Sequence, residues 1–369
     1  MQRGRSSFRG QVNAGAGSVW FLSGMAQGPP QPRQNRLTNN LLGSRVEGEE
    51  KANMQDKKAR GQIRVGPAGW SYPDWDGIVY PRPRPPGFSE ATYLAGFFDT
   101  IEINTTFYHP PSPQAAKGWV RKVAANPDFK FTAKLWQRFT HERNPNRQEE
   151  KAFKEGLAPL READRLGALL LQFPWSFKNT RENREYLGGL VVEFMEYPLV
   201  LEVRHDSWNQ PEIFRMLAEL GVGFCNLDQP IIGRSIAPSD YSIPQSGIGY
   251  VRLHGRNYEQ WFTSDSRPEE RYNYLYSMEE LEPWAQRIRN IAEQVNATYV
   301  ITNNHFQGKA VANALQLTSL LTNRPVRVPE SLLVRYPELE KILEPGSVTL
   351  QPRQSDLAFG APSPGKESA

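Results

Sequence analysis

One rhythm recurs along the chain between Gln62 and Leu321: a short apolar or β-branched run, then polar residues, then a stretch with helical spacing of its apolar residues. The eight runs are QIRVG (from Gln62), DTIEIN (Asp99), FKFTAKL (Phe129), ALLLQF (Ala168), LVLEVR (Leu199), VGFCNL (Val222), GYVRLH (Gly249) and TYVITN (Thr298). Strands that alternate with helices form parallel sheets, and eight such units over about 260 residues match a (β/α)8 barrel. The sequence therefore predicts a single α/β domain with a TIM-like barrel.

The segments between these runs predict the helices. Helical spacing of apolar residues occurs in SEATYLAGFF, PQAAKGWVRKVA, EEKAFKEGLAPLREADRL, RENREYLGGLVVEFME, PEIFRMLAEL, MEELEPWAQRIRNIAEQV and KAVANALQLTSLLT. The sixth connection, Gln229 to Ile248, lacks this spacing. A doubly wound open sheet is the alternative arrangement of the same elements. We favour the closed barrel because of the residues that follow each run.

Polar side chains gather where the runs end. All five histidines follow an apolar run, and none lies in a predicted helix; they are His109, His141, His205, His254 and His305. In TIM barrels the catalytic groups collect at the carboxyl ends of the strands. The histidines are therefore expected to lie at one end of the barrel.

Seven ionisable residues near the run ends are candidate catalytic groups: Glu102, Lys134, Glu202, Arg204, His205, Asp228 and His254. Carboxylates beside lysine or arginine acquire separated pKa values, and histidine titrates near neutrality, so such a set supports acid–base chemistry. In LEVRH, strand alternation puts Glu202 and Arg204 on one face and His205 on the other. Because the outer face of a barrel packs under helices, we expect Glu202 and Arg204 to point inward.

A divalent metal is a second hypothesis for the same end of the barrel, and the sequence does not identify a cofactor. Histidine, aspartate and glutamate are ligands of zinc or manganese, and Glu102, His205, Asp228 and His254 follow four different strands that can converge. The alternative is a buried lattice of ion pairs in which Glu102 and Glu202 face lysine and arginine.

Aromatic and amide side chains near the run ends are candidate substrate-binding residues. The set is Trp70, Tyr72, Trp75, Asn104, Tyr108, Trp136, Gln172, Trp208, Arg252, Asn303 and Asn304. Rings at a cleft stack on sugars or nucleobases, although rings also seal the ends of barrels by packing. The nearby cations Arg138, Arg143, Arg256 and Lys309 are candidate phosphate ligands or solvated surface residues.

The chain ends differ in composition from this body. Residues 1–46 contain six arginines and no acid, so much of the net charge of +4 belongs to this segment. Its Gly, Gln, Asn, Ser and Pro content predicts a disordered basic extension over residues 1–60, and residues 346–369 are predicted to be a disordered tail. The extension also has features of a transit peptide, and Met25 and Met54 are alternative starts. The barrel is predicted to span residues 61–345.

Two further observations bear on location. No apolar run approaches the roughly 20 residues that cross a bilayer, so no membrane-spanning segment is predicted. Cys225 is the single cysteine and lies in an apolar run, which indicates a buried thiol in a reducing compartment. A cytoplasmic protein is therefore expected.

Seven motifs in order give the chain a family resemblance. They are IRVGPAGWSYPDWDGIVYP, FDTIEINTTFYHPPS, FKFTAKLWQRFTH, LGALLLQFPWSF, LVLEVRHDSW, YVRLHGRN and NNHFQGKAVANALQL. Together they resemble the YecE-like family, also called domain of unknown function seventy-two, from Ile63 to about Pro345. The resemblance implies a TIM-like barrel in a cytoplasmic protein, and it implies no established activity. Pro67 and Thr302 depart from the family pattern, which usually has a small hydroxyl residue and an aromatic residue there.

Three functions fit these features. The first is a metal-assisted hydrolase that acts on a phosphate-containing or nucleic-acid ligand at the carboxyl ends of the strands. The second is a protein that binds or acts on carbohydrate, with the aromatic rings as the platform and the carboxylates as the acid and base. The third is a non-catalytic interaction module whose polar lattice only stabilises the barrel.

Overall fold

A computed structural model describes residues 61–260 and 268–346 of the 369-residue chain. The segments expected to be disordered, 1–60 and 346–369, lie outside these ranges apart from Gly346. Within the described ranges, no helix combines the length and the apolar character needed to span a bilayer.

Each of the eight apolar runs forms a strand, which confirms the predicted positions. The strands are β1 (Gln62–Pro67), β2 (Thr100–Ile103), β3 (Lys130–Lys134), β4 (Leu166–Gln172), β5 (Leu199–Glu202), β6 (Gly223–Asp228), β7 (Ile248–Leu253) and β8 (Ala297–Thr302). All the strand pairings are parallel, and the order around the sheet is β1-β8-β7-β6-β5-β4-β3-β2. Neighbours in the sequence are thus neighbours in space, as in a TIM barrel.

The two ends of this sheet meet beside Gly66. Ala68 forms a parallel bridge with Glu102 of β2, and the Gly69 amide donates to the Glu102 carbonyl oxygen over 2.8 Å. A Cβ atom at Gly66 would lie 1.8 Å from the Thr100 carbonyl oxygen, so the close approach of β1 and β2 requires glycine here. The sheet is a nearly closed barrel, and the alternative of an open doubly wound sheet is wrong.

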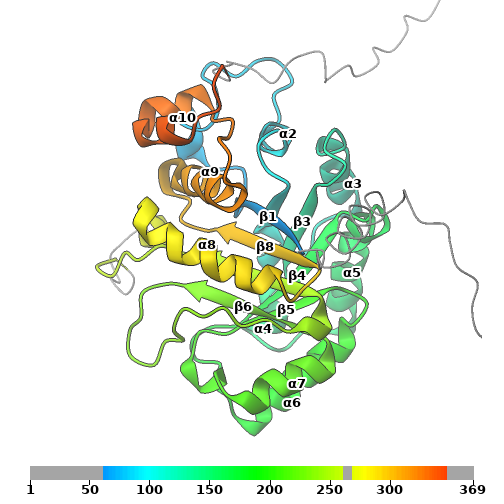
Figure 1. Cartoon of the computed structure of the whole chain (residues 1–369). Coiled ribbons are helices and arrows are strands. Elements are labelled where there is room, and N and C mark those ends of the chain that lie inside the picture. The colour runs from blue at the N-terminus through cyan, green and yellow to red at the C-terminus, as the bar shows by residue number, and fades with distance from the viewer. Residues whose placement is uncertain (1–60, 261–267, 347–369) are drawn as a thin grey trace, which may run out of the picture. The chain divides into compact units, whose positions relative to one another are not determined.

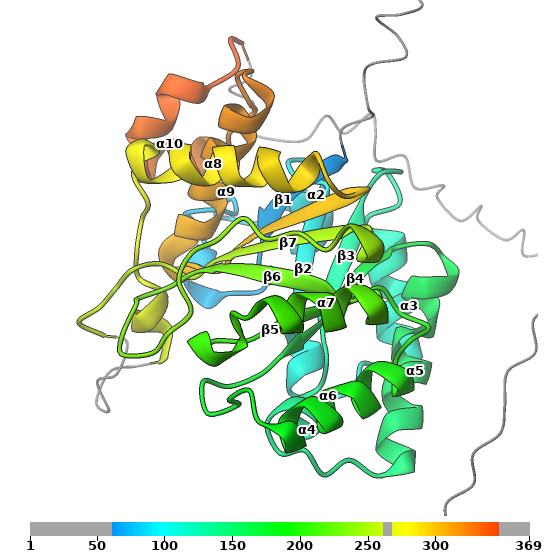
Figure 2. The ribbon, with the colours of Figure 1, turned by 60° about the horizontal axis from the view of Figure 1, so that its bottom comes forward.

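Helices surround the strands in both views of the ribbon (Figures 1 and 2). They are α2 (Glu90–Ala95), α3 (Pro113–Lys122), α4 (Gln137–Thr140), α5 (Arg147–Glu162), α6 (Arg181–Glu193), α7 (Pro211–Leu220), α8 (Met278–Ala292), α9 (Lys309–Thr322) and α10 (Glu330–Arg335). Reciprocal capping boxes fix the first turns of α5, through Asn146 and Glu149, and of α8, through Ser277 and Glu280. All seven predicted helical segments contain a helix.

The structure departs from the predicted elements in three places. The short helices α4 and α10 were not expected, because four to six residues carry too little periodicity to be recognised. The predicted helix that reached Leu166 ends at Glu162, since Asp164 takes a left-handed conformation (φ 51°) and Leu166 begins β4. The sixth connection, in contrast, agrees with the prediction. It contains no α-helix and only the 3-10 turn η4 (Pro244–Ser246), as its lack of helical spacing of apolar residues indicated.

Single 3-10 turns follow several strands at their carboxyl ends. They are η1 (Pro73–Trp75), η2 (Thr105–Phe107), η3 (Asp206–Trp208), η5 (Pro268–Tyr272) and η6 (Phe306–Gly308), with η7 (Pro337–Ile342) near the end of the described chain. Cys225 lies on β6, where burial raises the pKa of its thiol. At the departure from the family pattern on β8, the Thr302 hydroxyl donates to the Ala310 carbonyl oxygen over 2.9 Å.

Candidate functional site

Arg252 of β7 lies at the centre of a buried group of charges. Its Nη1 donates to Glu202 Oε2 over 2.6 Å, and its Nη2 donates to Glu102 Oε1 over 2.8 Å. All three side chains are fully enclosed. Because a buried ion is stable only when it is paired, these two bonds are the main stabilising contacts of the Arg252 guanidinium.

Three further side chains complete this group. Arg204 Nη2 donates to Glu202 Oε1 over 3.1 Å, and Lys134 Nζ lies 3.9 Å from Glu102 Oε1. His254 Nε2 lies 3.9 Å from Glu202 Oε1 and 3.4 Å from Arg252 Nη1. We call Glu102, Lys134, Glu202, Arg204, Arg252 and His254 the ionic cluster. It unites five of the seven predicted catalytic residues with Arg252, which was predicted to bind substrate.

Strand alternation explains which residues reach the ionic cluster. Glu202 and Arg204 both point to it, as the spacing in LEVRH predicted. On β7 the same alternation brings Tyr250 inward with Arg252 and His254. The Tyr250 hydroxyl donates to Glu102 Oε2 over 2.9 Å and lies 2.8 Å from Thr132 Oγ1 of β3. Neither Tyr250 nor Thr132 was predicted. Each lies two residues before a cluster residue, Arg252 or Lys134, so strand alternation places it on the same face of its strand.

Burial and neighbouring charge shift the pKa values in the ionic cluster. Burial alone would raise the pKa of Glu202, but Arg252, Arg204 and Lys134 lower it overall. Burial, followed by the charge of Arg252, lowers the pKa of Lys134 to about 8. The same two causes hold the pKa of His254 well below its usual value, so His254 is neutral at pH 7. The cluster therefore contains a neutral imidazole and a lysine that titrates near neutrality.

A row of rings lies on one side of the ionic cluster. Tyr72 stacks on His305 with ring centroids 4.4 Å apart, and Tyr272 lies 4.9 Å from His305 and 6.5 Å from His254. The Tyr72 hydroxyl donates to the Ala68 carbonyl oxygen and accepts from Asn104 Nδ2. Tyr72 and Asn104 were predicted, whereas Tyr272 belongs to the loop after β7, where no sequence pattern marks it.

A second group of rings lies near Lys134. Its Nζ is 5.5 Å from the centroid of Phe107, which makes edge contacts with Tyr108 and His141. Trp136 donates from Nε1 to the Tyr108 carbonyl oxygen over 2.9 Å. Tyr108 is 64% exposed, so its ring is available to a ligand. The predicted residues Tyr108 and Trp136 thus lie in the loops that follow β2 and β3.

Two amide oxygens near the cluster have no hydrogen-bond partner among the described residues, although both are buried. They are Asn104 Oδ1, just after β2, and Gln172 Oε1, at the end of β4. Gln172 is paired in register with Glu202 on β5. On the other side, the Asn303 amide nitrogen lies 3.0 Å from His254 Nδ1. These three predicted binding residues contribute polar groups around the ionic cluster.

Two predicted catalytic residues lie outside the ionic cluster. His205 points to the loop side of β5, where its Nδ1 accepts from the Ser207 amide and its ring makes an edge contact with Trp175. Asp228 is bound by both of its oxygens to Arg256 Nε, at 3.1 and 3.0 Å. Burial raises the pKa of Asp228, and Arg256 opposes that rise. Both side chains serve neighbouring loops rather than the cluster.

Four predicted binding residues serve packing instead. Trp75 and Trp208 are fully buried, and their indole nitrogens donate to the carbonyl oxygens of His305 and Phe177. Trp70 packs against Trp119 and Phe131, and Asn304 donates to the Tyr274 carbonyl oxygen and to Asn313 Oδ1. The indole nitrogens of Trp75 and Trp208 and the amide nitrogen of Asn304 are thus engaged within the protein, while Asn304 Oδ1 is buried without a hydrogen-bond partner among the described residues. The role of these four side chains in substrate binding stays a prediction.

The proposed metal ligands do not converge. Within residues 61–260 and 268–346, no three His, Cys, Asp or Glu side chains form a group that could hold a metal ion. Glu102 is bound to Arg252, Asp228 to Arg256, and His205 to Ser207, so these three side chains do not join His254 in one metal site within the described residues. The alternative, a buried lattice of ion pairs, describes the contacts of Glu102 and Glu202.

The cations suggested as phosphate ligands form ion pairs or hydrogen bonds with other side chains of the protein. Arg138 pairs with Glu142 and Glu149, Arg256 with Asp228 and Glu280, Arg143 donates to Asn183 Oδ1, and Lys309 donates to Asn273 Oδ1. Lys134 and Arg204 differ from these side chains, since both belong to the ionic cluster and retain 12% and 18% exposure.

The fold and the ionic cluster together define a (β/α)8 barrel protein with an ionisable site at the carboxyl ends of its strands. Residues 64–335 match the model of the family described as "Protein of unknown function DUF72", and the chain belongs to that family. The Bacillus subtilis (strain 168) protein called UPF0759 protein YunF is 30% identical over 273 residues, which are 70% of this chain and 94% of that protein.

Two solved structures of the same family resemble the barrel. A protein from Thermotoga maritima MSB8 is 34% identical, with a TM-score of 0.62 and coverage of 71% of this chain and 99% of its own. A protein from Enterococcus faecalis V583 is 25% identical, with a TM-score of 0.62 and coverage of 71% and 96%. Both are described only as members of this family.

Proposed function

We propose that the ionic cluster binds a small organic phosphate that also carries hydroxyl groups, such as a sugar phosphate, and that the protein acts on this ligand as an enzyme. The observation that carries the proposal is a surplus of positive charge on the side of the cluster that solvent reaches. Three cations, Lys134, Arg204 and Arg252, face only two carboxylates. Lys134 and Arg204 are the partly exposed members, so an entering anion meets them first.

The partly enclosed position strengthens this attraction. Charges interact more strongly where water is excluded, and arginine binds phosphate oxygens with a planar pair of donors. Among the residues that the structure describes, the guanidinium of Arg204 donates only to Glu202, through Nη2, so its other nitrogens remain available to a ligand. The phosphate group is therefore assigned to Arg204.

The hydroxyl groups of the ligand are matched by the free amide oxygens. A buried acceptor without a partner costs about 1–3 kcal/mol, which a hydroxyl donor from a ligand would recover. Asn104 Oδ1 and Gln172 Oε1 are acceptors of this kind beside the ionic cluster. A ligand with both a phosphate and hydroxyl groups can bind the guanidinium through its phosphate and the two amide oxygens through its hydroxyl groups. Inorganic phosphate or a neutral sugar can match only one of these two kinds of contact.

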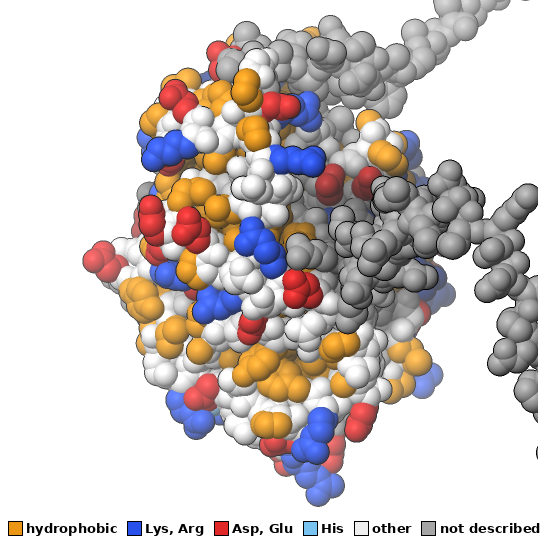
Figure 3. Space-filling view, in the orientation of Figure 1, with side chains coloured by type: hydrophobic (Ala, Val, Ile, Leu, Met, Phe, Trp, Pro, Cys, Tyr) orange, Lys and Arg blue, Asp and Glu red, His pale blue; other side chains and the backbone are white. Residues whose placement is uncertain are grey.

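A small ester is favoured over a nucleic acid. A nucleic-acid surface usually carries an extended basic stripe, whereas positive and negative side chains are interspersed on the face shown in Figure 3. A neutral carbohydrate is favoured less, because Trp70, Trp75 and Trp208 pack within the protein rather than offering open rings. The proposal therefore keeps the phosphate-containing class and narrows it to small molecules.

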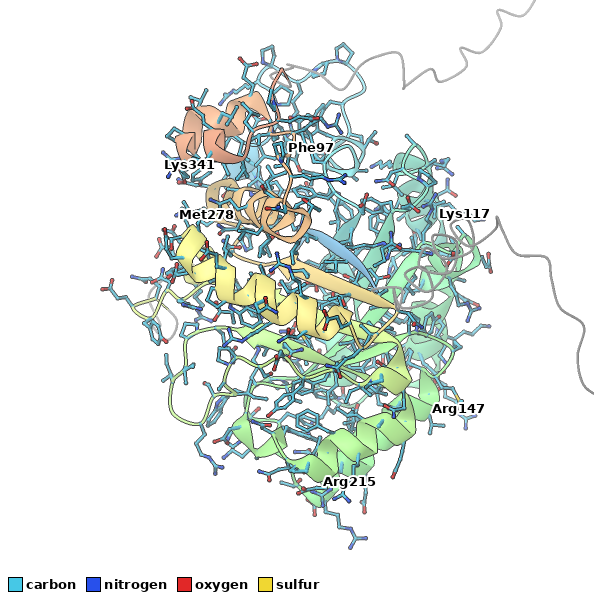
Figure 4. All side chains as sticks on the ribbon, viewed as in Figure 1. Phe97, Lys117, Arg147, Arg215, Met278 and Lys341 are labelled. Atoms are coloured by element: carbon cyan, nitrogen blue, oxygen red, sulfur yellow. The ribbon has the colours of Figure 1, made fainter. Side chains whose placement is uncertain are left out.

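The experiment is a binding titration by calorimetry with glucose 6-phosphate as the probe, beside glucose and inorganic phosphate. The wild-type protein is compared with Arg204→Gln and with Arg215→Gln, a matched change on the exposed face of α7, where Figure 4 labels Arg215. Loss of a charge-assisted contact should weaken phosphate-ester binding by about tenfold or more. Arg215→Gln should bind like the wild type.

Each result bears on the proposal. Glucose 6-phosphate that binds more tightly than glucose and inorganic phosphate, with a loss confined to Arg204→Gln, supports it. Equal binding of glucose and its phosphate would favour a carbohydrate site instead. No binding of any probe, or the same affinity in both variants, would overturn the proposal in favour of a structural lattice.

A further inference from the structure

Lys134 is held differently from the lysine at the other end of its strand. Lys130 begins β3, and its Nζ donates to the Asp164 carbonyl oxygen and forms a 2.6 Å ion pair with Asp164 Oδ1. Lys134 ends β3, and its Nζ makes no hydrogen bond to any residue in the described ranges. Its ion pair with Glu102 spans 3.9 Å, beyond hydrogen-bond distance. The amine is therefore enclosed but not tethered.

The surroundings of Lys134 favour the loss of its proton. Glu102 and Glu202 are both held by Arg252, so their charge is already compensated from another strand. Nζ also lies 5.5 Å from the Phe107 ring, an apolar neighbour. With the pKa lowered to about 8 by burial and then by Arg252, roughly a tenth of the molecules carry a free amine at pH 7. An ordinary lysine, with a pKa of about 10.4, has a far smaller fraction of free amine at pH 7.

We propose that Lys134 is an amine nucleophile that forms an imine with an aldehyde or ketone group of the bound organic phosphate. The inference rests on the proposed function, because the phosphate on Arg204 would hold the carbonyl group near Lys134. It extends that function by naming the substrate class, a carbonyl-bearing phosphate ester, and the first chemical step.

The step is balanced without an oxidant or a reductant. The Nζ lone pair forms a bond to the carbonyl carbon, and the C=O π electrons move to the oxygen, which takes up a proton while Nζ releases one. The carbinolamine then takes up a second proton on its oxygen and loses water, which leaves a protonated imine. His254, neutral at pH 7 and affected by the charge of Lys134, is the nearby group suited to accept and return a proton.

A purely structural lysine would show different geometry. A side chain that stabilises the barrel by charge would approach Glu102 closely, as Arg252 does at 2.8 Å. Lys134 instead remains at 3.9 Å, with 12% of its side chain exposed. The inference therefore rests on two neighbouring features. The Lys134 amine is enclosed without a hydrogen bond among the described residues, and Arg204, the proposed phosphate ligand, belongs to the same ionic cluster.

The test uses pyridoxal 5′-phosphate as the probe, because it combines an aldehyde with a phosphate. The full chain is incubated with less than one equivalent of probe, reduced with borohydride and digested, and the modified lysines are located by mass spectrometry. Pyridoxal, which lacks the phosphate, is the matched probe. Lys117, exposed on α3 and labelled in Figure 4, is the internal control. Lys134 should be modified about tenfold or more faster than Lys117, because the free-amine fraction of Lys134 exceeds that of an ordinary lysine.

The variants and the pH dependence separate this inference from the proposed function. Labelling of Lys134 should increase with a midpoint near pH 8, be stronger with the phosphate probe, and decrease about tenfold in Arg204→Gln. Labelling spread over surface lysines without preference for Lys134, in a protein that still binds glucose 6-phosphate through Arg204, would overturn the imine and leave the anion site. Equal labelling of Lys134 by both probes would keep the nucleophile and overturn the phosphate ester as its substrate.

Discussion

Arg252 donates to Glu202 across 2.6 Å in a part of the barrel where neither side chain is exposed. Through its other terminal nitrogen the same guanidinium binds Glu102, so one cation joins β5 and β2, two strands that are not adjacent in the sheet. Removing one partner of a buried ion pair leaves an uncompensated charge and costs about 3–5 kcal/mol. Arg252 is thus a structural link as well as a part of the candidate site.

The first prediction concerns this link. Arg252→Met should lower the free energy of unfolding by about 3–5 kcal/mol in urea denaturation, because both carboxylates lose their main partner. Arg215→Met, on the exposed face of α7, should change it by less than about 0.5 kcal/mol. The triple variant Arg252→Met, Glu102→Gln, Glu202→Gln should recover much of the loss, since no carboxylate then remains in the ionic cluster. Equal stability of the two single variants would contradict the ion-pair account.

Lys134 has the opposite effect on stability. Its pKa is about 8 in the folded protein, lowered from 10.5 by burial and then by Arg252. At pH 7 the side chain is charged in both the folded and the unfolded states, and only the folded state has the penalty of desolvating that charge. The difference between the two pKa values corresponds to about 3 kcal/mol. The fold tolerates this penalty at the position where an amine nucleophile is inferred.

The second prediction concerns the stability effect of removing the Lys134 charge. Lys134→Met should raise the free energy of unfolding at pH 7 by up to about 3 kcal/mol. Between pH 8 and 10.5 the folded wild type has lost the proton that the unfolded chain retains, so the wild type gains stability and the advantage of the variant shrinks. Urea denaturation at pH 7, 9 and 10 measures both effects, with Lys117→Met as the control. A variant less stable than the wild type at pH 7 would show that Lys134 is a stabilising charge.

The strand positions and most of the ionic cluster could be predicted because both depend on short-range periodicity. Alternation along LEVRH and GYVRLH determines which side chains share a face, and it brings Glu202, Arg204, Arg252 and His254 to the inside. The same rule applied to Tyr250 and Thr132 would have added the hydroxyls that contact each other beside Glu102.

The remaining contacts depend on the paths of loops, which periodicity does not determine. The loop after β7 turns so that Tyr272 lies beside His305 and Arg256 binds Asp228. Aromatic residues after strands are equally compatible with ligand stacking and with packing under a helix. Here Trp70 packs against Trp119, and Trp208 stacks on Phe177.

The third prediction uses the histidines as reporters of acid sensitivity. Burial lowers the pKa values of His141, His205 and His254. As the pH falls below about 6.5 the unfolded chain binds protons that the folded protein does not, so stability should fall toward pH 5.5. Each histidine contributes at most about 1.4 kcal/mol per pH unit.

Urea denaturation between pH 7.5 and 5.5 measures this slope. His254→Gln should reduce the slope by up to one proton, and His109→Gln, at an exposed position after η2, is the control variant. An unchanged slope in His254→Gln would mean that this imidazole already takes up a proton in the folded state, and it would remove the proton acceptor from the imine step.

The fourth prediction concerns the Tyr250 hydroxyl, which contacts Glu102 of the ionic cluster. Tyr250→Phe removes the hydroxyl that donates to Glu102 Oε2, which should cost about 1–3 kcal/mol because a buried carboxylate loses a donor. Tyr299→Phe on β8 is the matched control, since the Tyr299 hydroxyl has no hydrogen bond to any residue that the structure describes, and it should cost less than about 0.5 kcal/mol. Affinity for glucose 6-phosphate should be unchanged in both variants, because Tyr250 is fully buried and is not among the proposed ligand contacts, which are Lys134, Arg204, Asn104 and Gln172. A Tyr250→Phe protein that keeps its stability but loses the ligand would place the hydroxyl in contact with the substrate, so the site would extend deeper into the barrel.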